Sequence, residues 1–328
     1  MRCLALFTGG LDSQIAVRMM QRQAIEVIGV HIRTPFTPPA NDARVAAERV
    51  GIELREIEWL TDYLNLLRRP LFGFAQEMAP CLDCRIGMLQ RAQQQLESLA
   101  ASFLISGEVV GQRPSSLRSR DLESIAVHGG VDDLLLRPLS AQLLPPTLPE
   151  RNGWVDRTQL HGWHGRGRRE QLLLAREWNL VSEREQQNSC LLLEPTYAGR
   201  LRFLLKQSSN PPLWHLATLK FGRHFGLENR AHIVVAKNAD EGRELTTLFD
   251  ANVATANVAL LQPLNFRGPL ALLIGNIDDG TLQAAATLVA RYGKDVLPEE
   301  STISVRGTVD RHVTVPCAQP DQVVAPWH

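Results

Sequence analysis

A glycine-rich stretch close to the N-terminus, Phe7-Thr8-Gly9-Gly10-Leu11-Asp12-Ser13, constrains the fold more than any other part of the chain. The apolar run that leads into it, residues 3–7, predicts a short buried strand. The residues that follow it have the apolar spacing of a helix, at Ile15, Ala16, Met19 and Met20. The stretch is therefore predicted to be the turn between a buried strand and the start of a helix.

The residues of this turn favour an anion-binding site. Gly9 and Gly10 allow the backbone to approach a ligand closely, because they carry no side chain. Asp12 and Ser13 fall in the first helical turn, where free N–H groups and the helix dipole attract anions. The ligand that suits this geometry is a di- or triphosphate. A carboxylate beside phosphates is repulsive unless a metal lies between them, so Asp12 predicts a bound Mg²⁺.

The stretch differs from two common phosphate-binding motifs. A P-loop ends in Gly-Lys-Ser/Thr, but no lysine stands here, and the pattern is not G-x-G-x-x-G either. It resembles the pyrophosphate loop S-G-G-x-D-S of the ATP pyrophosphatases, with Thr8 in place of the first serine. The resemblance implies a nucleotide-binding loop made of Thr8, Gly9, Gly10, Leu11, Asp12 and Ser13.

Composition limits the class of protein. The chain has 328 residues, of which 44% are hydrophobic, enough for one large or two ordinary domains. Its formal net charge is zero, so no global field draws it to nucleic acid, and DNA is not an expected partner. It has five cysteines, no signal-peptide pattern and no apolar run long enough to span a membrane. We therefore expect a cytoplasmic protein with reduced thiols and no membrane partner.

Strands and helical segments alternate after the glycine-rich stretch. Four further strands are predicted, at residues 26–31, 53–58, 102–106 and 134–136. Asp42 is predicted to cap the intervening helix that runs to Val50. This alternation predicts an α/β fold with a doubly wound parallel sheet. With strand order 3-2-1-4-5, the first and fourth strands flank the switch point at which ligands bind.

The chain is predicted to have three parts. Residues 1–150 form the nucleotide-binding domain, residues 151–200 an arginine-rich connecting segment, and residues 201–328 a second, smaller α+β domain. In the last part we predict strands at residues 231–236, 253–261 and 270–274, helices at residues 239–248 and 281–292, and a hairpin or an irregular strand pair at residues 302–315. Three arginines of the connecting segment, Arg166, Arg168 and Arg169, are interpreted either as contacts to RNA phosphates or as part of a solvated linker.

The loop after the fourth predicted strand, residues 107–114, also carries a glycine at its start. Gly107 would bring this loop to the same sheet edge as the first one. Glu108 and Gln112 are interpreted as contacts to ATP or to the base being modified. The alternative is that they cap a helix.

Cys81 and Cys84 have C-x-x-C spacing, which zinc sites, redox pairs and iron–sulfur clusters all use. Cys190 is a third candidate. Three thiolates suit a [4Fe–4S] cluster with one open iron, or a pair that forms a disulfide while it relays sulfur. His161 and His164 would complete a zinc site instead. A pair of buried, inert thiols is the remaining alternative.

The helix that follows the C-x-x-C segment is predicted over residues 85–99. Its N-terminus is expected to lower the thiol pKa of Cys84 and so to favour the thiolate. Leu191, Leu192 and Leu193 are expected to anchor the return of Cys190 to the first domain. Cys3 lies in the first strand and is interpreted as a core residue, and Cys317 lies in a proline-rich tail and is interpreted as incidental.

Three segments together carry a family resemblance: residues 8–13, residues 81–84 and residues 107–114. They look like the ATP-pyrophosphatase domain of tRNA thiouridine synthetases, and most like the 4-thiouridine branch. The resemblance covers residues 1–195 and implies an adenine nucleotide alpha hydrolase (HUP-like) fold. Residues 200–310, around Phe221-Gly222-Arg223 and Glu228-Asn229, resemble more weakly the RNA-binding domain of ribosome-quality-control factors.

The resemblance implies an enzyme that uses ATP and Mg²⁺ to adenylate the carbonyl of a tRNA uridine and then replaces the oxygen by sulfur. Its partners would be tRNA and a sulfur donor, either a protein or sulfide. The nucleotide loop begins at residue 7, so we expect the C-terminal domain to dock the RNA. Two other functions stay open: ATP-dependent adenylation of a small metabolite, and a non-catalytic, nucleotide-regulated RNA-binding protein.

Overall fold

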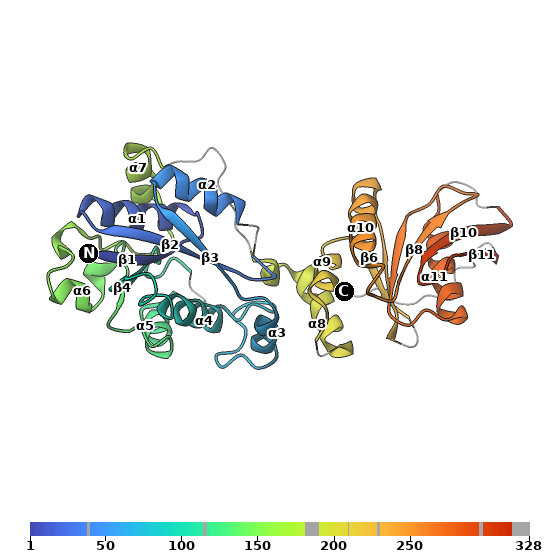
Figure 1. Cartoon of the computed structure of the whole chain (residues 1–328), viewed down its shortest axis with the longest axis horizontal. Coiled ribbons are helices and arrows are strands. Elements are labelled where there is room, and N and C mark those ends of the chain that lie inside the picture. Colours follow the sequence, from blue (N-terminus) through green and yellow to red (C-terminus); the bar gives the residue numbers. More distant parts are fainter. Residues whose placement is uncertain are drawn as a thin grey trace. The chain divides into compact units, whose positions relative to one another are not determined.

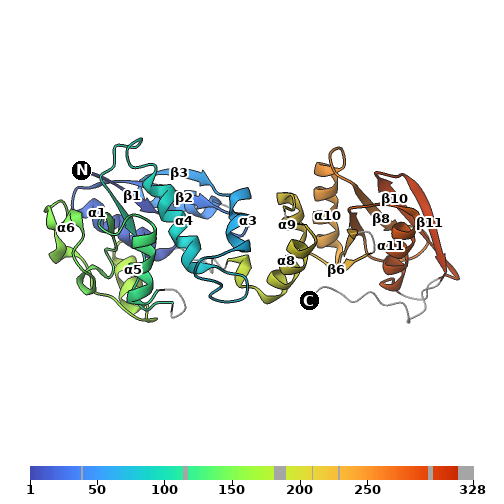
Figure 2. The same ribbon diagram turned by 90° about the horizontal axis from the view of Figure 1, so that it is seen from below.

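The computed structural model describes residues 1–37, 40–113, 117–180, 190–208, 210–227, 230–294 and 298–316. The chain folds into two compact units, Met1–Glu194 and Pro195–His328 (Figures 1 and 2). No helix in the described part of the chain combines the length and the apolar character that a bilayer crossing requires.

The first unit is built on a five-stranded sheet. Its strands are β1 (Arg2–Leu6), β2 (Glu26–Arg33), β3 (Glu53–Glu58), β4 (Phe103–Ser106) and β5 (Leu135–Leu136). All neighbouring strands are parallel and their order is β3-β2-β1-β4-β5. The predicted α/β fold with a parallel sheet is therefore confirmed, and the strand order is the one assumed for the switch point. β2 runs two residues beyond its predicted end, because His31, Ile32 and Arg33 stay paired with β3.

Helices cover both faces of this sheet (Figure 1). One face carries α1 (Leu11–Arg22), α2 (Asn41–Val50) and α7 (Arg169–Glu177), and the other carries α4 (Cys81–Gln93) and α5 (Ser119–His128). The short helices α3 (Thr61–Arg68) and α6 (Leu148–Arg151) complete the unit. α7 packs on α1, so the unit continues to Glu194, beyond the boundary at residue 150 that the composition suggests.

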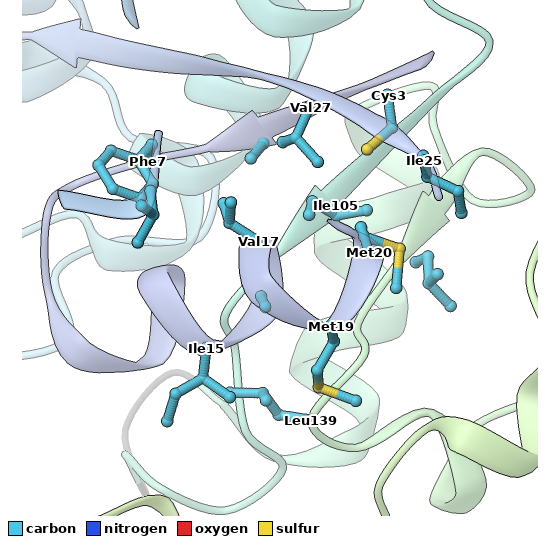
Figure 3. Close-up of a cluster of buried hydrophobic side chains, with 14 of the residues drawn as sticks. Cys3, Phe7, Ile15, Val17, Met19, Met20, Ile25, Val27, Ile105 and Leu139 are labelled. Atoms are coloured by element: carbon cyan, nitrogen blue, oxygen red, sulfur yellow. The ribbon is translucent and has the colours of Figure 1, made fainter. Parts of the chain in front are cut away.

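The side chains between α1 and the sheet form the core of the first unit (Figure 3). Cys3, Phe7, Ile15 and Met20 are each 1% exposed or less. The helical apolar pattern after the glycine-rich stretch and the core position of Cys3 are thus both confirmed. Burial of this apolar surface, at roughly 25 cal/mol per Å², fixes α1 against β1 and so positions the loop that joins them.

Two local predictions in the first unit are wrong. Asp42 does not cap α2: the residue at the N-cap is Ala40, no side chain bonds there, and Asp42 lies in the first turn, near the positive end of the helix dipole. α4 begins at Cys81 rather than at Arg85 and ends at Gln93. Pro80 precedes α4 directly, and its carbonyl accepts the Cys84 N–H at 2.8 Å, so both cysteines of the C-x-x-C segment lie within the first helical turn.

The second unit contains an antiparallel six-stranded sheet of order β11-β10-β8-β9-β7-β6. The strands are β6 (Arg223–Gly226), β7 (His232–Val235), β8 (Val258–Pro263), β9 (Ala271–Ile274), β10 (Glu300–Gly307) and β11 (Arg311–Pro316). The helix α10 (Ala239–Asn252) covers one face and α11 (Asp279–Arg291) the other, each over its own apolar core. The smaller α+β domain is confirmed, and so is the hairpin, β10–β11. Sequence patterns missed β6, α8 (Pro195–Gln207) and α9 (Leu213–Thr218), which are short or lack clear periodicity.

Three buried histidines form a hydrogen-bonded chain in the second unit. His224 Nε2 lies 2.7 Å from the Phe221 carbonyl oxygen, which only accepts, so Nε2 carries the hydrogen. His224 Nδ1 then accepts from His232 Nε2 at 2.8 Å, and His232 Nδ1 accepts from His215 Nε2 at 2.9 Å. The chain therefore requires three neutral rings of the same tautomer. Burial lowers the pKa of His215 to about 4 and that of His224 to about 3, and it also lowers the pKa of His232.

We expect this histidine chain to make the second unit sensitive to acid. The pKa values in the folded state lie below the unfolded value of about 6.5, so the unfolded state binds more protons as pH falls. Stability should be fully present above pH 6.5 and decline below it, by up to roughly 1.4 kcal/mol per pH unit for each proton taken up. Urea unfolding between pH 7.5 and 4.5 measures the decline. His312 is exposed, so the variant His312→Gln serves as a control and should show the same decline of stability with falling pH. A free energy of unfolding that does not change with pH in the unaltered protein would contradict the expectation.

Candidate active site

The glycine-rich stretch forms the loop between β1 and α1, as predicted, and Gly10 is the N-cap of the helix. Gly9 has φ +79°, and a Cβ there would come 2.8 Å from Ala43 Cα, so only glycine fits. Side chains from the first turn hold the loop: Ser13 Oγ donates to the Gly10 carbonyl at 2.7 Å, and Gln14 Nε2 donates to the Gly9 carbonyl at 2.8 Å. The loop is thus fixed before any ligand arrives.

Asp12 connects this loop to the loop after β4. Gln112 Nε2 donates to Asp12 Oδ2 at 2.9 Å. A Cβ at Gly107 would lie 2.5 Å from the carbonyl carbon of Asp12, so the two backbones touch at a position that only glycine allows. Asp12 Oδ1 is buried and has no hydrogen-bond partner among the described residues. This orphaned carboxylate oxygen is the kind of group that a divalent cation satisfies.

Glu108 is engaged by protein side chains. Its Oε2 accepts from Arg137 Nε at 2.9 Å and from Ser106 Oγ at 3.1 Å, and its Oε1 lies 3.1 Å from Arg85 Nε. Burial raises the pKa of Glu108, but Arg137 and Arg85 outweigh this effect, so the pKa lies below its ordinary value. Arg85 also donates to the Cys81 carbonyl at 3.1 Å. In this structure Glu108 orients Arg85 beside the first turn of α4.

The three candidate thiols come from two segments. Cys81 and Cys84 lie in the first turn of α4, and Cys190 precedes a short 3₁₀ helix, η3 (Leu191–Leu193). Backbone hydrogen bonds dock η3 on the first unit: the Leu191 N–H donates to the Phe36 carbonyl at 3.1 Å, and the Met78 N–H donates to the Leu192 carbonyl at 3.3 Å. The return of Cys190 is therefore anchored by the backbone as well as by the fully buried Leu192.

The expectation of a lowered thiol pKa at Cys84 is wrong. Burial raises the pKa of Cys84 to about 12, and a hydrogen bond from Tyr63 and the charge of Arg85 offset only part of this effect. Burial also raises the pKa of Cys190. Desolvation of the thiolate is the largest effect on the pKa of Cys84. At neutral pH both thiols are therefore protonated in the free protein.

One cavity of about 670 Å³ brings these groups together. Its lining includes Thr8, Gly9, Gly10, Leu11, Asp12, Ser13, Cys81, Cys84, Gly107, Glu108, Gln112 and Cys190. All the residues that sequence analysis singled out as catalytic or nucleotide-binding thus lie around one space, of a size typical for small-ligand sites. Leu11 also packs against the core of the unit.

The cavity also includes residues that sequence reasoning did not single out, among them His31, Tyr63, Arg85 and Arg113. Burial lowers the pKa of the Arg113 guanidinium and Arg85 lowers it further, whereas Cys81, Cys190 and Asp12 raise it. Arg113 is therefore a cation within electrostatic reach of both the thiols and the phosphate loop. Arg85 directly follows the C-x-x-C segment, and that adjacency was the one available signal in the sequence.

The connecting segment contributes to the cavity only in part. Arg166 and Arg168 line it, whereas Arg169 begins α7. His161 stacks on Trp163 with ring centroids 4.2 Å apart, and the lining includes neither His161 nor His164. Within the described residues, no group of three His, Cys, Asp or Glu side chains is arranged to hold a metal ion. Cys317, Glu228, Asn229 and Pro114 lie outside the described residues.

Comparison with known proteins supports two similarities. Residues 1–142 match the family model described as thiamine biosynthesis protein (ThiI), and residues 222–328 match the one described as NFACT protein RNA binding domain. A curated protein of Methanothermobacter thermautotrophicus, named probable tRNA sulfurtransferase, is 29% identical over 150 residues, covering 42% of this chain and 36% of its own length. A protein of the same name from Methanobrevibacter smithii is 28% identical over 148 residues, covering 42% and 37%.

Solved structures are also similar, among them the following two. A 4-thiouridine synthetase in complex with RNA and ATP aligns with TM-score 0.41 and 20% identity over 67% of this chain and 52% of its own. A predicted subunit of tRNA methyltransferase from Methanocaldococcus jannaschii aligns with TM-score 0.31 and 15% identity over 42% and 69%. The chain spans little more than a third of the curated relatives' length. Both resemblances stated from the sequence are confirmed: the first unit is similar to tRNA sulfurtransferases, and the second to an RNA-binding domain.

Proposed function

We propose that this chain is an ATP-dependent enzyme that thiolates a uridine of tRNA. The observation that carries the proposal is the shared cavity, which both the loop at residues 8–13 and the three candidate thiols line. Thiolation needs a base carbonyl to be activated and sulfur then to be delivered. A single cavity allows the activated base to be attacked where it forms, without diffusing to a second site.

In the first half-reaction, the carbonyl oxygen of the base attacks the α-phosphorus of ATP. An O–P bond forms, the bond to the β-phosphate breaks, and pyrophosphate leaves. The N–H groups at the start of α1 and the guanidinium groups of Arg113, Arg166 and Arg168 are the donors that would stabilise the departing charge. The product is an adenylated base that has AMP as its leaving group.

Asp12 fits the proposed Mg²⁺ ion. Its Oδ1 is buried without a partner among the described residues, while its Oδ2 is fixed by Gln112. When bound, Mg²⁺ would supply positive charge to the phosphates that leave. Asp12 itself would then repel the pyrophosphate less and would hold the phosphate end of the nucleotide against the loop.

In the second half-reaction, sulfur replaces AMP at the base carbon. In the relay scheme, the terminal sulfur of a persulfide on one cysteine attacks this carbon and AMP leaves. A second thiol then attacks the bridging disulfide, which releases the thiocarbonyl and leaves a disulfide between the cysteines; an external reductant restores both thiols. The charges of Arg85 and Arg113 would lower the cost of each thiolate.

Cys81, Cys84 and Cys190 would also be the ligands of the proposed [4Fe–4S] cluster. The donor set and its place on the cavity wall suit a three-thiolate cluster, but the three side chains as they stand are not spaced as metal ligands. When bound, such a cluster would supply an iron able to bind inorganic sulfur. A bound metal would also keep these thiols deprotonated although burial raises the pKa of Cys84 and Cys190.

The role of Asp12 predicts the effect of a near-isosteric change. Asp12→Asn keeps an oxygen for Gln112 but removes the negative charge. We expect pyrophosphate release to fall by about a hundredfold or more, as when a charge-stabilising group is removed, with little change in Tm. The rate of pyrophosphate release at saturating Mg²⁺ measures this effect. The control is Glu26→Gln, at the first residue of β2. Unchanged turnover would refute the role of Asp12.

The cysteines should be needed for sulfur transfer but not for nucleotide binding. Serine at Cys81, Cys84 or Cys190 should abolish thiolated tRNA and leave ATP affinity within about twofold. Cys317→Ser serves as the matched control and should remain active. Full activity of Cys190→Ser would remove the third thiol from both schemes.

Anaerobic reconstitution with iron and sulfide separates the two sulfur schemes. A cluster should give a brown, oxygen-sensitive protein with absorption near 400 nm, roughly where iron–sulfur charge transfer is found. Each of the three serine variants should lose that absorption. A colourless, iron-free protein that still transfers sulfur would leave the persulfide relay.

The second unit is proposed to dock tRNA. A chain ending at Glu194 keeps the whole described cavity and the first core, so it should bind ATP almost as tightly as the full chain. Its affinity for tRNA should fall at least tenfold. Filter binding of tRNA and calorimetry of ATP, after circular dichroism has verified folding, measure the two effects. Equal tRNA affinity in both proteins would contradict this role of the second unit.

A further inference from the structure

Cationic side chains gather at one end of the sheet in the second unit. Arg223 is the first residue of β6 and lies opposite Val235, the last residue of β7, so Lys237 follows just beyond this pair. Val235 also lies opposite Ala271, the first residue of β9, so the β8–β9 loop that carries Arg267 reaches the same end of the sheet. Because neighbouring strands are about 4.8 Å apart, the ends of β6, β7 and β9 lie within about 10 Å of one another.

The end of helix α11 adds another cation and an aromatic ring to this place. The guanidinium carbon of Arg223 lies 4.8 Å from the centre of the Tyr292 ring, directly after the last residue of α11. Lys294 forms an isolated β-bridge with Arg267, and its N–H donates to the Arg267 carbonyl at 2.6 Å. The side chains of Lys237, Arg267 and Lys294 are exposed. Together with Arg223 they are named here the cationic cluster.

Buried charged groups fix the backbone that carries two members of the cluster. Glu241 Oε2 accepts from the Gly222 N–H at 3.1 Å and from the Lys237 N–H at 2.7 Å, so one carboxylate oxygen ties the start of β6 to the end of β7. Arg200, which is 6% exposed, donates to the Gly222 carbonyl at 2.7 Å. The backbone at Arg223 and Lys237 is therefore positioned before a ligand arrives, which lowers the entropic cost of binding.

The positive charge of the cluster is not neutralised by ion pairs. Within the described residues, no carboxylate forms an ion pair with any of its four members, whereas at the opposite end of the sheet Arg306 pairs with Asp250 and Arg311 pairs with Asp279. The exposed acids at residues 299–300 stand at the start of β10, three strands away from β7 in the sheet order. Several close, unpaired cations on a fixed backbone suit a polyanion.

We propose that the cationic cluster binds the phosphate backbone of tRNA. This inference rests on the proposed docking of tRNA by the second unit and gives that docking a surface. Arginine and lysine contacts to phosphates position a nucleic acid without reading its sequence, so the cluster orients tRNA and does not select the modified base. The Tyr292 ring contacts the face of the Arg223 guanidinium, which leaves the N–H donors at its edge for a phosphate.

The test measures the affinity of the full-length protein for tRNA at several KCl concentrations. The triple variant Lys237→Gln, Arg267→Gln, Lys294→Gln removes three exposed charges and leaves Arg223 and Tyr292 in place. At about 0.15 M salt its Kd for tRNA should rise by about tenfold or more. The slope of log Kd against log salt should fall by about two to three, because each phosphate contact contributes about 0.7–0.9. Each single variant should lower that slope by about one.

The matched control removes three charges at the opposite end of the sheet, through Arg230→Gln, Arg306→Gln and Arg311→Gln. Its Kd for tRNA should stay within about threefold of the unaltered protein, because salt screens charges that lie beyond about 8 Å. A further variant, Lys237→Arg with Lys294→Arg, keeps the charge of the cluster and should bind tRNA as tightly as the unaltered protein. Circular dichroism verifies that each variant is folded.

Two results would overturn the proposal in proteins that are folded and bind tRNA: a Kd that is unchanged in the triple variant, or one that rises as much in the control. A loss of affinity confined to tRNA would overturn it as well, because an unrelated RNA of equal length offers the same phosphates and should lose affinity by the same factor. These results contradict this inference alone. If the unaltered protein binds no tRNA, the proposed docking by the second unit fails with it.

Discussion

The contact between the backbones of Gly107 and Asp12 is the constraint on which the candidate site depends. It joins the loop after β1 to the loop after β4 at the point where the order of the parallel strands reverses. No residue but glycine fits, since a Cβ would lie 2.5 Å from Asp12. The Gln112–Asp12 hydrogen bond reinforces the same contact. The phosphate loop therefore takes its position from β4 as well as from its own glycines.

A series of polar contacts extends from this junction to the thiols. Glu108 follows Gly107 directly and pairs with Arg85 and Arg137, and Arg85 in turn holds the first turn of α4 through the Cys81 carbonyl. The junction and the cysteines are thus connected by a few short, charged links. Removing one partner of a buried ion pair costs more stability than the intact pair contributes, because the other charge stays buried and unpaired. We therefore expect the effects of substitutions at Glu108, Arg85 and Arg137 to be non-additive.

What the sequence predicted correctly was local or periodic. The turn at residues 7–13 is indicated by its glycines and by the apolar pattern of Ile15 and Met19, and the alternation of strands and helices was enough to predict a parallel sheet. The pKa of Cys84 could not be predicted in this way, because it depends on burial against Tyr63 and other groups distant in sequence. The same holds for Glu108, whose partner Arg137 lies 29 residues away. The same holds for His31, whose Nε2 is buried without a hydrogen-bond partner among the described residues.

The buried polar groups of the cavity in the first unit differ from the buried histidine chain of the second unit. In the first unit, Asp12 Oδ1 and His31 Nε2 are buried without partners among the described residues, and both belong to residues of the cavity lining. In the second unit, the buried histidines satisfy one another and end on the Phe221 carbonyl. Unsatisfied buried groups cost stability unless a ligand pairs them, so they belong where a ligand binds; satisfied chains fix a single packing arrangement. A ligand that pairs Asp12 Oδ1 and His31 Nε2 should therefore stabilise the first unit, whereas the histidine chain of the second unit loses stability through protonation.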